Sequence, residues 1–162
     1  MNPAPFCLIG IVNVTPDSFS DGGKYIDPCN AVAHGLRLLD EGAGMLDLGA
    51  ESTRPFAEPV PEGEEIARLM PVVARLREQR PDAVLSVDTL KAGTARAALE
   101  GGADIINDVS ACVADPALLD VLAEYKPGYV LMHSQGSPRE MQVNPRSGNV
   151  VEEILAFFEE HL

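Results

Sequence analysis

Polar side chains follow most of the short apolar runs in this sequence. They are Asn13, Asp47, Asp88, Asn107 with Asp108, and His133. Asp and Asn at such positions also cap helices or fix turns, so each one alone is weak evidence for a site. Where parallel strands alternate with helices in a barrel, the carboxyl ends of the strands open on one face. Five polar positions at these ends therefore favour a shared pocket, and this convergence is the main reason to expect an enzyme.

Asp88 and Asn107 have side chains suited to the edge of a flat heterocycle. A carboxylate accepts two N–H bonds in one plane, and an amide offers both a donor and an acceptor. The pair therefore indicates a base-like or pterin-like ring. The run Ser52-Thr53-Arg54 adds two hydroxyls and a guanidinium in a loop that leads toward a helix, which suits a phosphate or carboxylate. The alternative for the arginine is simple solvation.

The polar segment from Asn13 to Gly23 ends in two glycines and is long enough to be a mobile loop over the same face. Phe19 is its aromatic residue. An exposed aromatic side chain is costly, so Phe19 either covers an aromatic substrate or packs on the rim of the fold. The sequence favours neither reading over the other.

The elements that would position these residues alternate between short apolar runs and longer segments of helical period. This pattern is typical of parallel strands joined by covering helices. The predicted strands are 7–12, 45–48, 84–87, 105–106 and 129–132. The predicted helices start at Asp27-Pro28 and end at Gly42, cover 62–80 and 91–100, start at Asp115-Pro116, and run from 151 to the terminus. Pro71 predicts a kink in the second helix or a helix that begins there.

One internal echo supports repeated β/α units. Residues 42–47 read Gly-Ala-Gly-Met-Leu-Asp, and residues 102–107 read Gly-Ala-Asp-Ile-Ile-Asn. In each copy the Gly-Ala pair would end a helix, and the final Asp or Asn would end a strand. Chance similarity between two helix-to-strand turns is the alternative.

Composition narrows the class of protein. The 162 residues are 46% hydrophobic, which is enough for one globular domain with a sizeable core. Lys and Arg total 12 against 25 Asp and Glu, so the net charge of -13 disfavours nucleic acid and anionic membranes as partners. No membrane span or secretory leader is evident, and a cytoplasmic location is expected. The three cysteines lack paired spacing and are expected to be buried packing thiols.

Several of these segments resemble one known family, the dihydropteroate synthases. Residues 10–23 (GIVNVTPDSFSDGG) resemble the first signature of that family, and residues 46–55 (LDLGAESTRP) resemble the second. Residues 86–89 (SVDT), 105–110 (IINDVS) and 131–136 (LMHSQG) are similar to three later blocks in the same order. The resemblance implies an α/β fold of the TIM (β/α)8 barrel family.

The resemblance also implies a reaction and a set of binding residues. The family joins 6-hydroxymethyl-7,8-dihydropterin diphosphate to p-aminobenzoate and releases pyrophosphate, with Mg²⁺ at the diphosphate. By this resemblance Asn13 would contact Mg²⁺ and Thr53 the diphosphate side of the substrate. Asp88 and Asn107 would hold the pterin ring, with Asp47 nearby. None of these residues is expected to act as an acid or base.

The two loops of the resemblance would enclose the second substrate. Phe19, Arg54 and Pro55 would lie around p-aminobenzoate, and around the sulfonamide drugs that target the family. Members commonly form homodimers, so the full-length parent of this chain is expected to do the same. The reaction separates charge, which Mg²⁺ and cationic groups can stabilise, so no covalent nucleophile is required.

The family pattern continues beyond the motifs present here. Its last three βα units carry a glycine-rich segment with a lysine, a Ser-Arg-Lys segment and a terminal Arg-x-His. Residues 1–162 are therefore expected to be the N-terminal part of one pterin-binding domain, truncated before those units and folded as an incomplete barrel of about five βα units with open sheet edges. The alternatives are a non-catalytic pterin-binding fragment and a methyltetrahydrofolate-handling domain, which is not expected to carry both loops.

Overall fold

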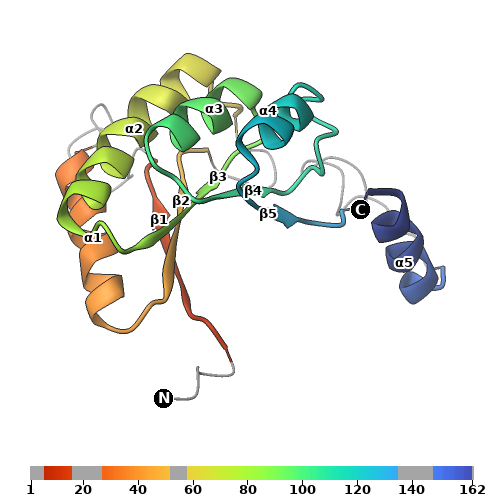
Figure 1. Cartoon of the computed structure of the whole chain (residues 1–162), viewed down its shortest axis with the longest axis horizontal. Coiled ribbons are helices and arrows are strands. Elements are labelled where there is room, and N and C mark those ends of the chain that lie inside the picture. Colours follow the sequence, from red (N-terminus) through yellow and green to blue (C-terminus); the bar gives the residue numbers. More distant parts are fainter. Residues whose placement is uncertain (1–5, 16–26, 52–57, 135–147, 162) are drawn as a thin grey trace.

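The computed structural model describes residues 6–15, 27–51, 58–134 and 148–161, which form five strands alternating with five helices (Figure 1). The strands are β1 (Ile9–Asn13), β2 (Met45–Gly49), β3 (Val84–Asp88), β4 (Ile105–Asp108) and β5 (Gly128–Leu131). The helices are α1 (Pro28–Asp40), α2 (Glu62–Gln79), α3 (Ala92–Glu100), α4 (Leu118–Tyr125) and α5 (Val150–His161). Every predicted strand is confirmed to within two residues at each end.

All five strands are parallel and lie in chain order, β1-β2-β3-β4-β5. Helices α1 to α4 cover one face of the sheet, whereas α5 lies apart beyond β5 (Figure 1). The core fills the space between the sheet and helices α1 to α4. Its fully buried side chains include Leu46, Leu48, Leu69, Leu76, Leu85 and Ile106. The sequence prediction of about five βα units of a barrel is confirmed.

The other face of the sheet is open in the described part of the chain. In β1, Gly10 and Val12 are buried, while Ile9, Ile11 and Asn13 alternate with them and are exposed. Ile9 and Ile11 are 54% and 62% exposed, which shows that the face opposite the helices carries apolar side chains without cover. The sheet is therefore the open arc that the sequence predicts, with β1 and β5 as its two edges.

The helix ends follow from local chemistry. Asp27 caps α1, since its Oδ1 accepts a hydrogen bond from the Cys29 amide at 2.9 Å, and Pro28 occupies the first turn. At the other end Gly42 has a φ of +108°, a conformation that glycine adopts without strain. Its N–H donates to Leu39 O, and the Ala43 N–H donates to Leu38 O, which together form a Schellman cap.

The same cap recurs 60 residues later. Gly102 has a φ of +98°, its N–H donates to Leu99 O, and the Ala103 N–H donates to Ala98 O. Both copies deliver the chain directly into a strand, β2 or β4. Residues 42–47 and 102–107 therefore form the same helix-to-strand turn, as the echo in the sequence predicts.

Two expectations need correction, and one alternative is removed. Helix α2 runs continuously from Glu62 to Gln79, so no helix begins at Pro71, and a kink there stays a prediction. Helix α4 begins at Leu118, three residues after Asp115, and the residues between them form a turn in which the Ala117 amide donates to Asp115 Oδ1. Cys112 is buried as expected, but Cys7 and Cys29 are exposed, so packing does not account for those two thiols.

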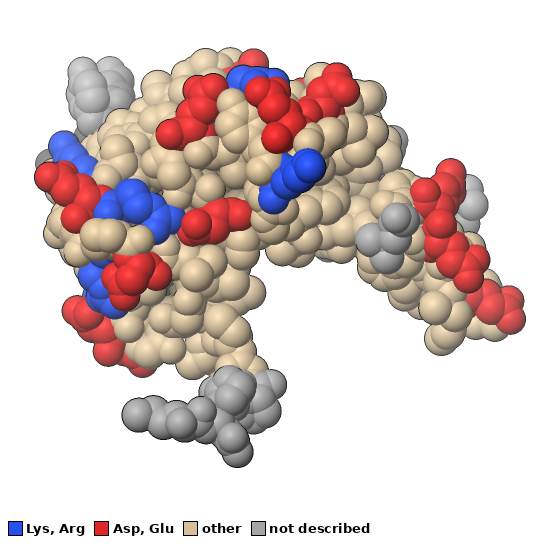
Figure 2. Space-filling model, viewed as in Figure 1, with Lys and Arg blue, Asp and Glu red and all other residues tan. Residues whose placement is uncertain are grey.

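Charged side chains gather over the helices. Figure 2 shows Asp and Glu side chains over the helical layer and along α5, while the inner side of the arch is largely free of charge in this view. No helix in the described ranges combines the length and the apolar character that crossing a bilayer requires.

Candidate active site

Four of the predicted site residues lie toward the carboxyl ends of neighbouring strands. Asn13, Asp88 and Asn107 share one level of the sheet through the register Asn13↔Gly49↔Asp88↔Asn107. Asp47 lies at the level of Ser86, two residues closer to the amino ends of the strands. All face away from the helices, because they alternate with the buried residues of their strands. The sheet therefore gathers these polar side chains on its open face, at one rim.

Asp47 is the hydrogen-bonding centre of this group. Its Oδ1 accepts a bond from the Ser86 hydroxyl at 2.6 Å, and its Oδ2 accepts one from the Asn107 amide at 3.0 Å. The second bond fixes the orientation of the Asn107 amide, which still has one N–H and its carbonyl oxygen to offer. A ligand at this rim would meet side chains already held in place.

Asp88 carries an unusual charge balance. The pKa of Asp88 is raised from 3.8 to about 7. Burial is the largest cause, and the negative charges of Asp47, Glu65, Asp108 and Glu51 also contribute. The carboxylate is thus costly to ionise in the unliganded chain at neutral pH. A ligand that brings N–H donors to Asp88 would relieve this cost, so the residue is a candidate binding group.

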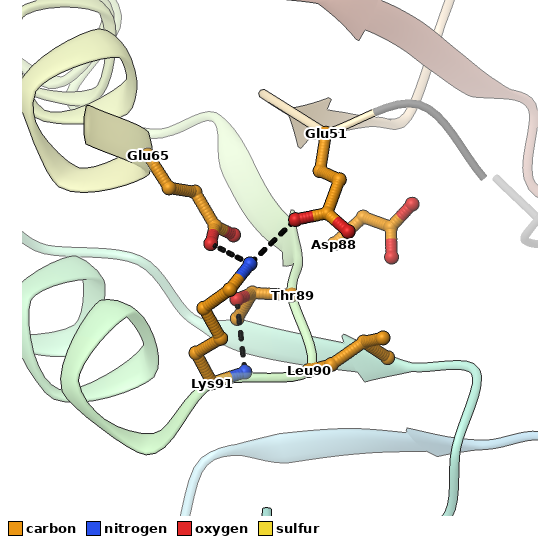
Figure 3. Close-up of a pocket in the computed structure, with 6 residues that line it drawn as sticks. All are labelled: Glu51, Glu65, Asp88, Thr89, Leu90 and Lys91. Carbon is orange, nitrogen blue, oxygen red and sulfur yellow. Dashed lines mark hydrogen bonds and ion pairs between the residues drawn. The ribbon is translucent and has the colours of Figure 1, made fainter. Parts of the chain in front are cut away.

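A pocket beside Asp88 holds a compact ion-paired cluster (Figure 3). Lys91 Nζ lies 2.5 Å from Glu51 Oε2 and 2.6 Å from Glu65 Oε2. Thr89 and Leu90 complete the lining of the pocket. Burial alone would lower the pKa of Lys91, but the hydrogen bonds to both carboxylates and their negative charges outweigh this effect. The pKa of Lys91 is therefore raised. Lys91 therefore stays charged at neutral pH.

Hydrogen bonds also hold the chain where it leaves β2. Glu51 Oε2 accepts a bond from the Val60 amide at 3.2 Å, and Arg68 Nη1 donates to Ala50 O at 3.0 Å. The Val14 amide donates to Gly49 O at 2.7 Å and extends the pairing of β1 with β2 by one residue. The backbone around the carboxyl end of β2 is thus fixed by neighbouring elements.

Asp108 follows Asn107 but serves the opposite face of the sheet. It is fully buried, its Oδ1 accepts bonds from the Ser110 amide and hydroxyl, and its Oδ2 accepts bonds from the Cys112 amide and the Tyr129 hydroxyl. Burial raises the pKa of Tyr129 well above its usual range, so the hydroxyl remains a donor. Asp108 therefore stabilises the turn after β4 and is not available to a ligand.

The remaining predicted residues divide into two groups. His133 lies after β5, where its ring makes an edge-on contact with Phe157 of α5 at 4.9 Å between centroids. It packs against a helix, and no contact of the described residues joins it to the Asp47 group. Residues Phe19, Thr53, Arg54 and Pro55 lie outside the described part of the chain.

The described donor set provides no ready-made metal cage. Within the described ranges, no group of three or more His, Cys, Asp and Glu side chains could hold a metal ion. Asn13 is exposed on the open face and offers one amide oxygen, the kind of ligand that Mg²⁺ accepts. Mg²⁺ commonly takes its other ligands from water and substrate phosphates, so a single protein oxygen fits a shared site with a diphosphate.

Sequence reasoning missed Ser86, Glu51, Glu65 and Lys91 as parts of this rim. Strand alternation could have found Ser86, because it stands two residues before Asp88 and so shares its face. Glu65 was expected only as a favourable charge in the first turn of α2. Its contact with Lys91 depends on how α2 packs on α3, which the sequence pattern does not specify.

A parallel sheet with its strands in chain order, helices on one face and polar side chains at the carboxyl ends of the strands is typical of the β/α-barrel class of proteins. The profile of one family, described as pterin binding enzyme, matches residues 9–162. This chain belongs to the family of pterin-binding enzymes.

Known relatives and solved structures agree with this assignment. The dihydropteroate synthase of Mycobacterium leprae is 46% identical over 157 residues, which is 96% of this chain and 55% of the relative. The structure of Yersinia pestis dihydropteroate synthase with a sulfonamide drug aligns with a TM-score of 0.86 at 43% identity, over 96% of this chain and 56% of that one. The Xanthomonas albilineans enzyme with 4-aminobenzoic acid aligns at 0.83 and 48% identity, over 96% and 54%. This chain thus spans about half the length of the relatives it matches.

Proposed function

We propose that this chain belongs to a dihydropteroate synthase of folate biosynthesis. Such an enzyme condenses 6-hydroxymethyl-7,8-dihydropterin diphosphate with p-aminobenzoate to give 7,8-dihydropteroate and pyrophosphate. One observation carries the proposal: Asp88 and the Asp47–Asn107 pair converge at the carboxyl ends of β2, β3 and β4, where a flat ring with in-plane donors and acceptors would fit. Residues 1–162 would form the N-terminal part of one pterin-binding domain.

The pterin ring would be held mainly by Asp88. Two in-plane N–H groups of the ring would donate to the two carboxylate oxygens of Asp88. These hydrogen bonds would offset the free energy needed to ionise Asp88. Asn107 would use its free amide groups on the same ring, while Asp47 holds that amide in place. The residues thus bind and orient the ring and do not transfer protons.

The reacting bond would break by displacement of pyrophosphate. The amine of p-aminobenzoate would form a bond to the methylene carbon, the C–O bond to the diphosphate would break, and the amine would lose one proton. Mg²⁺, when bound, would neutralise charge that develops on the leaving diphosphate. Asn13 would supply one oxygen ligand to it, and Thr53 would contact the diphosphate side.

The second substrate would lie toward the two sequence loops. Phe19, Arg54 and Pro55 are proposed to surround p-aminobenzoate and the sulfonamides that compete with it. A cytoplasmic location and a homodimeric full-length parent complete the proposal. The second candidate function, pterin binding without turnover, is favoured by one feature: the open face leaves apolar side chains such as Ile9 and Ile11 uncovered beside the site.

Calorimetric titration with the dihydropterin diphosphate and Mg²⁺ tests the proposal. In Asp88→Asn one acceptor becomes a donor, so affinity should fall by at least about 100-fold, equivalent to roughly 3 kcal/mol. Asp82→Ala, which changes an 82%-exposed carboxylate at the opposite rim, is the matched control and should bind normally. Equal affinity in Asp88→Asn and the unchanged chain would contradict the assigned site.

Turnover separates the two candidate functions. Adding p-aminobenzoate to the bound complex and following pyrophosphate release would show whether the chain condenses the two substrates. Binding that depends on Asp88 but gives no pyrophosphate would support the binding-only alternative for this chain. Absence of binding in a folded sample would remove both.

A further inference from the structure

The rim beside Asp88 carries more negative than positive charge. Three carboxylates line the pocket, from the end of β2 (Glu51), the first turn of α2 (Glu65) and the end of β3 (Asp88). Lys91, the residue just before α3, supplies the single positive charge of the lining. Figure 3 shows its Nζ between the two glutamates, with the Asp88 carboxylate turned to the other side.

We propose that Lys91 is a positioning residue of the pterin site, which holds Glu51 and Glu65 in one ion-paired cluster and so limits the negative charge that Asp88 faces. The proposal rests on the assignment of Asp88 to pterin binding made above. Lys91 itself contacts neither carboxylate oxygen of Asp88 in the structure and is not assigned a contact with substrate.

The backbone between Asp88 and Lys91 is fixed, so the ammonium group has a defined position. The Thr89 amide donates to Asn107 O at 3.1 Å, and the Lys91 amide donates to Thr89 Oγ1 at 3.2 Å. Thr89 is 3% exposed. The next two amides, of Ala92 and Gly93, donate to acidic side chains of other elements. Lys91 is therefore anchored to β3 on one side and to the start of α3 on the other.

Glu65 shows why the ammonium matters. Glu65 is fully buried, and its Oε2 accepts a hydrogen bond from Lys91 Nζ. Its Oε1 has no hydrogen-bond partner among the described residues. Lys91 is thus the compensating charge for a carboxylate that water does not reach. Without Lys91, Glu65 would be an uncompensated buried carboxylate, and whatever negative charge it keeps would act on its neighbours with little screening.

Asp88 is the neighbour that would feel this change. The acidic groups around it come from every adjoining element: Asp47 on β2, Glu51 after β2, Glu65 on α2 and Asp108 on β4. Asp47 and Asp108 are engaged by hydrogen-bond donors of their own. Lys91 offsets one of the two negative charges of Glu51 and Glu65, and its replacement therefore changes the electrostatic field at Asp88.

Carboxyl ¹³C NMR of Asp88 as a function of pH tests the proposal in the full 162-residue chain. Lys91→Gln should move the titration midpoint of Asp88 upward by about 0.5–1 pH unit, because the positive charge that offsets Glu51 and Glu65 is then gone. Lys91→Arg keeps the charge and should restore the original midpoint. The double variant Lys91→Gln/Glu65→Gln removes one charge of each sign and should also return close to it. It remains informative if the single variant does not fold.

Binding of the dihydropterin diphosphate with Mg²⁺ gives the second readout. Affinity in Lys91→Gln should be about two- to fivefold weaker at pH 7 and approach that of the unchanged chain at pH 9, since an ionised Asp88 is needed. A midpoint that stays the same or falls in Lys91→Gln would overturn the proposal. If the unchanged chain binds no pterin, the proposed function fails, and the Asp88 titration in the same variants still decides the electrostatic role of Lys91.

Discussion

Arg77 and Asp88 lie near opposite ends of the strands of the sheet and show two uses of partly buried charge. At the amino end, Arg77 of α2 donates to Gly102 O at 2.6 and 3.1 Å, to Ala83 O at 2.8 Å and to Asp104 Oδ2 at 2.8 Å. At the carboxyl end, Asp88 lies among four acidic side chains and its pKa rises to about 7. Charge at the first end is satisfied by the protein itself, while charge at the second is, in the function proposed above, satisfied by a ligand.

The difference matches the division of labour in β/α barrels, in which the amino ends of strands serve stability and the carboxyl ends serve function. Asp104 illustrates the stabilising end. Its Oδ2 also accepts a bond from the Leu85 amide at 2.9 Å, and its carbonyl oxygen accepts one from the Gly128 amide, so it ties together β3, β4 and β5. No such network surrounds the Asp88 carboxylate among the described residues.

Replacing Arg77 should give the largest loss of stability. Arg77→Ala removes a guanidinium that satisfies the backbone carbonyls of Ala83 and Gly102 and pairs with Asp104, and we expect the free energy of unfolding to fall by roughly 3–5 kcal/mol. Urea denaturation monitored by circular dichroism measures this change. Pterin affinity per folded molecule should be unaffected, and a selective loss of affinity would break the comparison between the two ends.

Replacing Asp88 should raise the free energy of unfolding, and the size of this increase should depend on pH. Because its pKa rises from 3.8 in the unfolded chain to about 7 in the folded one, stability from this group is complete below pH 3.8 and is lost as pH rises through 7. Asp88→Asn should therefore stabilise the unliganded chain, and its advantage should grow by about 2 kcal/mol between pH 5.5 and pH 8.

Urea denaturation of both forms at the two pH values measures this advantage. Glu78→Gln, which changes an exposed carboxylate of α2 outside the pocket, serves as the control for general effects of pH. If the gain in free energy of unfolding from Asp88→Asn were equal at pH 5.5 and pH 8, ionisation of Asp88 would not destabilise the folded chain, and the prediction would be wrong.

Local sequence signals predicted the framework of both ends. The strands appear as short apolar runs. Gly42 and Gly102, which belong to the two Schellman caps, indicate where α1 and α3 end. These features depend on a few neighbouring residues, so they can be read without knowing the fold. The convergence of Asp47, Asp88 and Asn107 followed from one topological rule, that parallel strands point the same way.

Contacts between elements could not be predicted in the same way. Glu65 reaches Lys91 across 26 residues, and Arg77 reaches Gly102 across 25, because α2 packs beside α3. Their partners depend on the rotation of α2 about its axis, which its apolar stripe specifies only within a residue or so. The sequence left two options at Pro71 for a related reason: only the packing of α2 decides whether the helix continues through a proline despite its local cost.

Arg80 offers the smallest and most direct test of why the amino end is stable. It lies three residues after Arg77 and also faces acidic side chains, Asp40 at 3.0 Å and Asp82 at 3.8 Å, but both partners are at least 75% exposed. Solvent-exposed pairs of this kind contribute little, so Arg80→Ala should lower the free energy of unfolding by no more than about 1 kcal/mol.

Salt sharpens the contrast between the two arginines. In 1 M NaCl, where screening acts within about 3 Å, the small effect of Arg80→Ala should vanish, whereas most of the effect of Arg77→Ala should persist because it comes from hydrogen bonds to carbonyl oxygens. Unfolding of each variant at low and high salt measures both. If Arg77→Ala lost its effect in salt as well, simple charge pairing would explain the amino end, and the two ends of the sheet would differ only in the sign of their charges.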